Sequence, residues 1–277
     1  MMGDKPNKNL GQHWLRDRAT LEQVAAPAEL TTSDTVLEIG PGLGTLTRVL
    51  ADHAGRVIAV EFDRELADEL EATFASPILA GPGPAKVEVI NADFLQFDLN
   101  QLPAGYKVVA NIPYYITNKI IMKLLTSENK PGVAVLLVQK EVAERLAAKP
   151  GQMSILSVAA QFYADVELGI VVTADKFDPP PKVDSQVVIL HPHLANPILA
   201  RPGPAKDIDE KQFFRIVRAG FSQRRKKLHT ALAGGLNIST SEAKKLLQTA
   251  GIDSNLRAQD LTLSDWHNLV KQSKIFL

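Results

Sequence analysis

An Asn-x-Pro-aromatic turn has the groups needed to hold a flat base that carries an amino group. One apolar run of the chain ends at Asn111-Ile112-Pro113-Tyr114-Tyr115. Pro113 fixes its own φ and biases Ile112 toward extended backbone, so the turn is stiff. Asn111 offers an acceptor oxygen for an exocyclic N–H, and Tyr114 offers an aromatic face for stacking. We expect chemistry at this turn, and an ordinary β-turn with a solvated Asn is the alternative.

A glycine-rich turn earlier in the chain indicates a loop that binds a ligand. Glu38-Ile39-Gly40-Pro41-Gly42-Leu43-Gly44 stands between a predicted strand and a predicted helix. Glycines let a ligand approach the backbone there, and the helix N-terminus adds positive potential. The spacing is GxGxG, not the GxGxxG of dinucleotide folds, and Pro41 lacks an N–H that a pyrophosphate would use. The turn favours a nucleoside without pyrophosphate and argues against a nicotinamide dehydrogenase; tight packing is the alternative.

Acidic residues follow the next two predicted strands. Glu61 comes after the apolar run that begins at Arg56, and Asp93 comes after the run that begins at Lys86. A carboxylate can accept hydrogen bonds from both ribose hydroxyls or from an adenine amino group. Each acid alone is also consistent with a solvated turn. Because ligands of doubly wound sheets bind at the carboxyl ends of the strands, the three strand ends together predict one nucleoside pocket.

The periodicity of the chain predicts the elements that position these residues. From about residue 33 to 190, β-branched runs alternate with amphipathic stretches, which is typical of a mostly parallel sheet covered on both faces. The predicted strands are 35–39, 56–60, 86–90, 106–110 and 133–138, and the predicted helices are 43–52, 63–74, 116–125 and 140–148. Residues 162–172 and 183–190 follow without a long helix between them, which predicts a hairpin-like end to the sheet.

The β signal ends after residue 206, which predicts a second domain. Helices are predicted at 208–219, 224–233, 240–250 and 260–272. We therefore expect an α/β, Rossmann-like domain with an N-terminal arm at 1–195, a Pro-rich linker at 196–206 and a small all-α domain at 207–277.

A basic segment in the helical region predicts contacts with nucleic-acid phosphates. The formal net charge of the chain is zero, yet residues 211–230 contain no acidic residue. Local charge decides a phosphate contact. A solvated helix turn is the alternative. The residues that we expect to bind RNA are Arg218, Arg224, Arg225, Lys226 and Lys227.

Composition excludes several other classes of protein. The 277 residues contain no Cys, which excludes disulfide scaffolds and thiolate metal sites and favours a reducing compartment. The six His show no metal-ligand spacing, so we expect no metal. We see no apolar signal segment at the N-terminus and no apolar run long enough to span a membrane. A cytoplasmic protein that contacts no membrane is the expectation.

One segment occurs twice. Residues 196–206 repeat residues 76–86 except at the first and sixth positions of the segment. The Pro-Gly-Pro core of each copy cannot join a helix or a central strand. We interpret the copies as duplicated loop inserts without a catalytic role.

Taken together, these motifs resemble a known family. The set comprises Gly11-Gln12-His13-Trp14-Leu15, the turn 38–44, Glu61, Asn91-Ala92-Asp93, the turn 111–117 and Phe177-Asp178-Pro179-Pro180-Pro181-Lys182-Val183-Asp184-Ser185. The chain resembles the adenine-N6 dimethyltransferases of ribosomal RNA, most closely the bacterial 16S rRNA type, over nearly its whole length.

The resemblance implies S-adenosylmethionine as methyl donor and 16S rRNA, in the 30S subunit or its precursor, as partner. We expect the protein to be a monomer. It implies dimethylation of two adjacent adenines near the 3′ end of that RNA. By position, it implies a cofactor site made of Gln12, His13, Leu15, Glu38, Gly40, Gly42, Gly44, Glu61, Asp93 and Asn111. It also implies that Asn111, Ile112, Pro113, Tyr114 and Phe177 act on the target base.

Two departures and three alternatives stay open at this point. Trp14 stands where the family usually carries Phe, and His13 stands where many relatives carry Asn. Phe177 either docks into the core or faces the target base opposite Tyr114. A 23S rRNA methyltransferase of the antibiotic-resistance type is the alternative enzyme, and an RNA-binding assembly factor on the same scaffold is the alternative without catalysis.

Overall fold

The structure is a computed structural model that describes residues 13–75, 86–193 and 209–273. Gln12 and nearly all of the repeated Pro-Gly-Pro segment lie outside the described residues.

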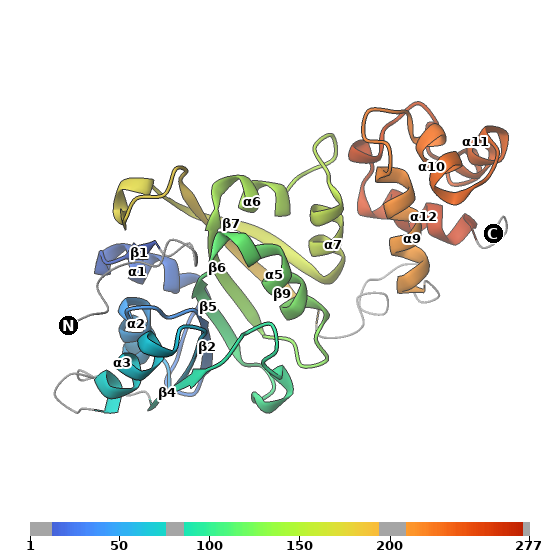
Figure 1. Cartoon of the computed structure of the whole chain (residues 1–277). Helices are drawn as coiled ribbons and strands as arrows, with labels where there is room; N and C mark the ends of the chain where they lie inside the picture. Colours follow the sequence, from blue (N-terminus) through green and yellow to red (C-terminus); the bar gives the residue numbers. More distant parts are fainter. Residues whose placement is uncertain (1–12, 76–85, 194–208, 274–277) are drawn as a thin grey trace. The chain divides into compact units, whose positions relative to one another are not determined.

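A seven-stranded sheet with the order β4-β3-β2-β5-β6-β9-β7 dominates the described part of the chain (Figure 1). Neighbours from β4 through β6 run parallel, and β9 runs antiparallel to β6. The strands are β2 (Thr35–Ile39), β3 (Arg56–Glu61), β4 (Lys86–Asn91), β5 (Lys107–Asn111), β6 (Val133–Gln139), β7 (Ala164–Val172) and β9 (Ser185–Pro192). The strand order reverses between β2 and β5, which is where doubly wound sheets bind ligands.

The connections between the strands are mostly helical, as their alternating pattern predicts. The α-helices of this region are α1 (Arg18–Ala25), α2 (Thr45–His53), α3 (Arg64–Ala75), α5 (Thr117–Thr126), α6 (Lys140–Leu146) and α7 (Ile155–Tyr163). The single-turn 3₁₀ helices are η2 (Ala26–Ala28), η3 (Leu99–Gln101), η4 (Tyr114–Ile116) and η5 (Ala174–Lys176). The α/β fold with a mostly parallel sheet is therefore confirmed.

A continuous apolar core fixes one face of the sheet against α1 and α2. Val36, Val57, Val109 and Val135 come from four neighbouring strands and are buried together with Leu50 of α2. On β6 this cluster takes every second residue, Val133, Val135 and Leu137, which is the periodicity of one sheet face. This packing holds the carboxyl ends of the strands in register.

A separate two-stranded sheet joins segments that are far apart in the sequence. Trp14–Leu15 forms β1 and pairs antiparallel with β8, Phe177–Asp178. The hydroxyl of Thr45 donates to the carbonyl of Leu15 over 2.8 Å, so the N-terminal arm is also tied to the glycine-rich turn.

The chain after residue 208 is helical in the part that the structure describes. The helices are α9 (Glu210–Phe221), α10 (Leu228–Leu236), α11 (Thr240–Thr249), α12 (Leu263–Ser273) and the short η7 (Ala258–Asp260). The described residues divide into two compact units: 13–75, 86–144 and 165–192 form one, and 145–164, 193 and 209–273 form the other. This division differs from the expected 1–195, 196–206 and 207–277, since α7 groups with the helical unit.

Two of the differences between predicted and observed element bounds have identifiable local causes or consequences. The strand expected from residue 162 begins at Ala164, because Phe162 and Tyr163 close α7. Ser154 caps that helix through Ser157 instead of the Glu or Gln that usually signals a capping box. The helix expected from residue 224 begins at Leu228, so Arg224–Lys227 form the turn before it.

Candidate active site

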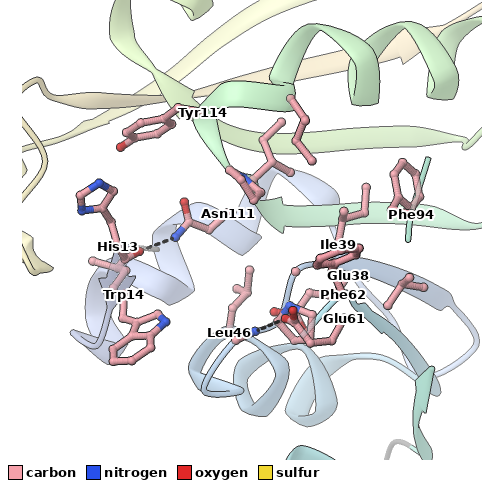
Figure 2. Close-up of a pocket in the computed structure, with 18 of the residues that line it drawn as sticks. His13, Trp14, Glu38, Ile39, Leu46, Glu61, Phe62, Phe94, Asn111 and Tyr114 are labelled. Carbon is pink, nitrogen blue, oxygen red and sulfur yellow. Dashed lines mark hydrogen bonds between the residues drawn. The ribbon is translucent and has the colours of Figure 1, made fainter. Parts of the chain in front are cut away.

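A cavity of about 310 Å³ opens where β2, β3, β4 and β5 end. Its wall comes from the N-terminal arm, the glycine-rich turn and the segments that follow each of these strands. Figure 2 shows Phe94 at one end of the cavity and His13 and Tyr114 at the other. The lining residues with functional groups are His13, Glu38, Thr45, Glu61, Asp93, Asn111, Tyr114 and Tyr115.

The glycine-rich turn needs its glycines for backbone geometry and for space. Gly42 has a φ of 55°, and a Cβ there would lie 3.3 Å from Nε1 of Trp14. Gly44 has a φ of 72° at the N-cap of α2, and a Cβ there would lie 2.3 Å from Leu70 Cδ1. Left-handed backbone is available to Gly without steric cost. Gly42 lines the cavity and Gly44 does not, so Gly44 serves the turn and the packing of α3.

Glu61 is a buried carboxylate held by the backbone. Its Oε2 accepts from Gly42 N over 3.0 Å and its Oε1 accepts from Asp63 N over 2.9 Å. Burial raises the pKa of Glu61 above its usual value, and the two backbone donors oppose that shift. Each oxygen keeps a second lone pair for a ligand hydroxyl. The side chain of Asn91 supports this turn by donating to the carbonyls of Glu61 and Phe62.

The end of β4 brings Asp93 to the cavity. Asp93 Oδ1 accepts from Leu95 N over 2.8 Å, which leaves the second oxygen of the carboxylate for a ligand. Phe94 lines the cavity and is almost fully buried, whereas Phe62 lines it and is 62 % exposed. An exposed aromatic face at a cavity mouth provides stacking surface for a flat ring.

Asn111 is oriented by the N-terminal arm. Its Nδ2 donates to the carbonyl of His13 over 3.3 Å. Because a carbonyl oxygen can only accept, this contact assigns the amide orientation and leaves Oδ1 as an acceptor. Figure 2 shows this oxygen on the side of Tyr114. Asn111 is the last residue of β5, so its direction is set by the sheet.

Tyr114 and His13 form an aromatic wall beside Asn111. Their ring centroids lie 5.8 Å apart with an interplanar angle of 25°. The hydroxyl of Tyr114 is hydrogen-bonded to Ser185 Oγ at 2.7 Å, and burial raises the pKa of Tyr114. Nδ1 of His13 lies 2.7 Å from the carbonyl of Pro179, so it is the protonated ring nitrogen. Both rings are thus fixed by one polar contact each.

Glu38 is a buried acid beneath the glycine-rich turn. It is 2 % exposed, and its Oε2 has no hydrogen-bond partner within the described ranges of the chain. Burial, reinforced by the nearby charge of Glu61, raises the pKa of Glu38 to about 8. A neutral carboxyl group is therefore the favoured form at pH 7.

The structure brings most of the predicted site residues together. The predicted residues that line the cavity are His13, Leu15, Glu38, Gly40, Gly42, Glu61, Asp93, Asn111, Ile112, Pro113 and Tyr114. Phe177 does not line it. Phe177 is 3 % exposed and packs in the core, because its strand pairs with β1 and places it opposite Leu15. Of the two placements left open for Phe177, the structure has the core position.

The predicted RNA-binding residues lie on the helical unit. Arg218 is in the last turn of α9, and Arg224, Arg225, Lys226 and Lys227 are exposed in the turn before α10. The Nζ of Lys227 donates to Asn255 Oδ1 over 2.7 Å.

The sequence reasoning missed Phe62 and Phe94. Each directly follows a predicted acid, Phe62 after Glu61 and Phe94 after Asp93, so proximity to a strand end was the available signal.

The chain matches known proteins over nearly its full length. A family model described as "Ribosomal RNA adenine dimethylase" matches residues 3–274. The chain belongs to the ribosomal RNA adenine dimethylase family. The predicted family is therefore confirmed, and the members of this dimethylase family are enzymes that transfer methyl groups to adenine in ribosomal RNA.

Individual relatives agree with membership of the dimethylase family. "Ribosomal RNA small subunit methyltransferase A" of Dehalococcoides mccartyi (strain CBDB1) is 40% identical over 268 residues, which are 96% of this chain and 87% of the relative. A dimethyladenosine transferase from Plasmodium falciparum has a TM-score of 0.77 at 25% identity, with 95% of this chain and 98% of the other covered. The 23S rRNA methyltransferase ErmE has a TM-score of 0.71 at 28% identity, with 94% and 98% covered.

S-adenosylmethionine is the methyl donor of this enzyme. The site fits that cofactor, because a buried carboxylate at Glu61 stands beside a glycine turn without a pyrophosphate cradle. In the part of the chain that the structure describes, no group of His, Asp or Glu is arranged to hold a metal ion. Among the described helices, none is long and apolar enough to cross a membrane.

Proposed function

We propose that the protein dimethylates the N6 amino groups of two adjacent adenines near the 3′ end of 16S rRNA in the small ribosomal subunit. The observation that carries the base chemistry is the orientation of Asn111, whose amide nitrogen is held by His13. The similarity to small-subunit methyltransferases at about 40% identity supports the choice of RNA.

The cofactor is held, in this proposal, by one group from each strand end. Glu61 accepts from the ribose hydroxyls, and Asp93 accepts from the adenine amino group. Phe62 stacks on the adenine with its exposed face. Gly40 and Gly42 let the methionine part approach the backbone, beside His13 and Leu15. When bound, the cofactor supplies an already activated methyl group on sulfur.

The target adenine is held by the turn after β5. Asn111 Oδ1 and the carbonyl of Ile112 accept the two amino hydrogens. N6 is a poor nucleophile because its lone pair delocalises into the ring, and these two acceptors favour a pyramidal nitrogen whose lone pair is free. Tyr114 stacks on the base, which has left its own stack. Positioning therefore supplies most of the rate.

In the second methylation N6 faces the same two acceptors but forms a hydrogen bond with only one of them. The first transfer leaves a positive charge on N6, which loses one proton to water and keeps one hydrogen, so one of the two acceptors is sufficient to orient it. Tyr115 lines the cavity and is exposed, and in this proposal the methylated amine turns toward that side.

The helical unit positions the RNA through its phosphates. Arg218 and the turn Arg224–Lys227 carry positive charge without an acidic residue in the surrounding segment 211–230. Contacts of this kind fix orientation on the RNA without reading its sequence. We place the enzyme in the cytoplasm as a monomer that acts on the 30S subunit or its precursor.

Methyl transfer to isolated ribosomal subunits tests this proposal. Labelled S-adenosylmethionine is incubated with undermethylated 30S subunits and, in parallel, with 50S subunits, and the RNA is digested to nucleosides. We expect N6,N6-dimethyladenosine in the 30S RNA alone.

Two other outcomes would replace the proposal. Label in the 50S RNA alone would assign the activity to 23S rRNA, as the similarity to ErmE allows. Absence of label, with S-adenosylmethionine bound, would leave an RNA-binding assembly role on this fold.

A further inference from the structure

Lys123 of α5 contacts the cofactor end of the cavity from behind. Its Nζ donates to the carbonyl of Leu95 over 2.9 Å and lies 5.5 Å from the centroid of the Phe94 ring. Phe94 and Leu95 line the cavity, whereas Lys123 does not. A lysine in this position supports the wall of the site without touching a ligand.

The backbone of Leu95 is held at both of its polar groups. Its N–H donates to Asp93 Oδ1 over 2.8 Å, and its carbonyl accepts from Lys123. The N–H groups of Gln96 and Phe97 both donate to the carbonyl of Asp93. The direction of the second Asp93 oxygen therefore depends on a turn that Lys123 closes.

The charge of Lys123 also acts on this turn. Asp93 and Asp98 attract its ammonium group, and partial burial lowers the pKa of Lys123. Partial burial strengthens such an attraction relative to one in free solvent. A methionine at position 123, which is neutral and has no N–H donor, would remove both the attraction and the hydrogen bond to Leu95.

We propose that Lys123 is a positioning residue, which holds Asp93 in the direction needed to accept from the amino group of the cofactor adenine. The inference rests on the proposed role of Asp93. Since α5 directly follows the turn Asn111–Tyr114 and η4, Lys123 also links the segment that holds the target base to the segment that holds the cofactor.

The ratio of two affinities tests this inference. S-adenosylhomocysteine carries the adenine amino group, and its deaminated analogue S-inosylhomocysteine carries an oxo group instead. Calorimetry with the full chain gives the dissociation constant of each, for wild type and for Lys123→Met, Lys123→Arg and Lys119→Met. Lys119 is an exposed lysine one turn earlier on α5, so its substitution changes charge alone.

We expect wild type to prefer S-adenosylhomocysteine about 10-fold or more, as for a hydrogen bond to a charged group. Lys123→Met should lower this preference at least about threefold. Lys123→Arg and Lys119→Met should retain it. With 30S subunits and saturating S-adenosylmethionine, kcat of Lys123→Met should stay within about twofold of wild type while KM for the cofactor rises.

The possible outcomes distinguish the role of Lys123 from the role of Asp93 on which it rests. A wild type without preference would refute the role of Asp93 in the proposed function. A wild type with a preference that Lys123→Met retains, or equal weakening of both ligands, would overturn the role of Lys123. If Lys123→Met does not fold, Lys123→Gln takes its place, because it keeps a donor for Leu95 and loses the charge that attracts Asp93.

Discussion

At the scale of single residues, the Asn111 amide has one end bound by the protein and the other end available to a ligand. Its nitrogen contacts the His13 carbonyl, and its oxygen is left to the cavity. A substitution at position 111 that preserves only one of these two contacts would separate the positioning of the side chain from its binding of the substrate.

Asn111→Ala should lower the methylation rate about 100-fold, on the scale seen when one oriented polar group is removed from an active site. S-adenosylmethionine affinity should change less than about threefold, because the groups assigned to ribose and adenine remain. Single-turnover rates on 30S subunits and calorimetric titration of the cofactor measure the two effects. An unchanged rate would remove Asn111 from the mechanism.

Glu38 should make stability depend on pH. Its pKa rises from the ordinary 4.5 to about 8 on folding, so the folded chain binds this proton more tightly than the unfolded chain. Its stabilising contribution is then complete below pH 4.5 and is lost as the pH rises through 8, by up to about 1.4 kcal/mol per pH unit. Glu38→Gln should therefore gain stability relative to wild type between pH 5 and pH 8.

Urea unfolding at several pH values measures this difference. Glu71→Gln, which changes an exposed carboxylate of α3, is the control and should show no such trend. A difference between wild type and Glu38→Gln that stays constant with pH would contradict a neutral Glu38.

At the scale of elements, the start of α2 depends on a glycine that packing requires. Gly44 and Gly105 share a left-handed φ, 72° and 74°, but only Gly44 has a neighbour in the way of a Cβ. Gly105→Ala should cost about 1 kcal/mol of backbone strain. Gly44→Ala should cost about 2–4 kcal/mol, because the clash with Leu70 adds to that strain. Urea unfolding measures both variants. Equal losses of unfolding free energy in Gly44→Ala and Gly105→Ala would show that the packing around Leu70 adapts to the added Cβ.

The elements also show what the sequence could predict. Residues at strand ends were predictable, because a parallel sheet gathers the carboxyl ends of its strands: Glu61, Asp93 and Asn111 line one cavity as expected. Phe177 was not, since a stiff Pro-rich segment does not reveal which side of the chain it packs on. Lys123 was not either, because its contact with Leu95 joins a helix to a loop of unpredicted shape.

At the scale of the whole molecule, zero net charge conceals a local positive segment. Arg224 and Arg225 lie exposed in a stretch without acids, so counterion release should make RNA affinity fall steeply with salt. Arg224→Gln with Arg225→Gln should reduce the slope of log affinity against log salt by about 1.5.

Lys244→Gln with Lys271→Gln removes the same charge from exposed positions of α11 and α12 and is the matched control. Filter binding of 30S subunits over a salt series measures all three proteins. Equal slopes in both double variants would mean that net charge, not the turn before α10, governs association.

The helical unit is built from two pieces of chain. Phe162 of α7 packs against Phe213 of α9 with ring centroids 4.5 Å apart and an interplanar angle of 33°, and Tyr163 donates its hydroxyl to Glu210 Oε1 over 2.5 Å. A recombination event at residue 207 would carry α9 to α12 into a new chimera and leave their partner helix behind. Exchange of the intact helical unit between relatives therefore requires transplanting residues 145–164 together with the C-terminal segment, and a single-crossover library would sample mostly mismatched cores.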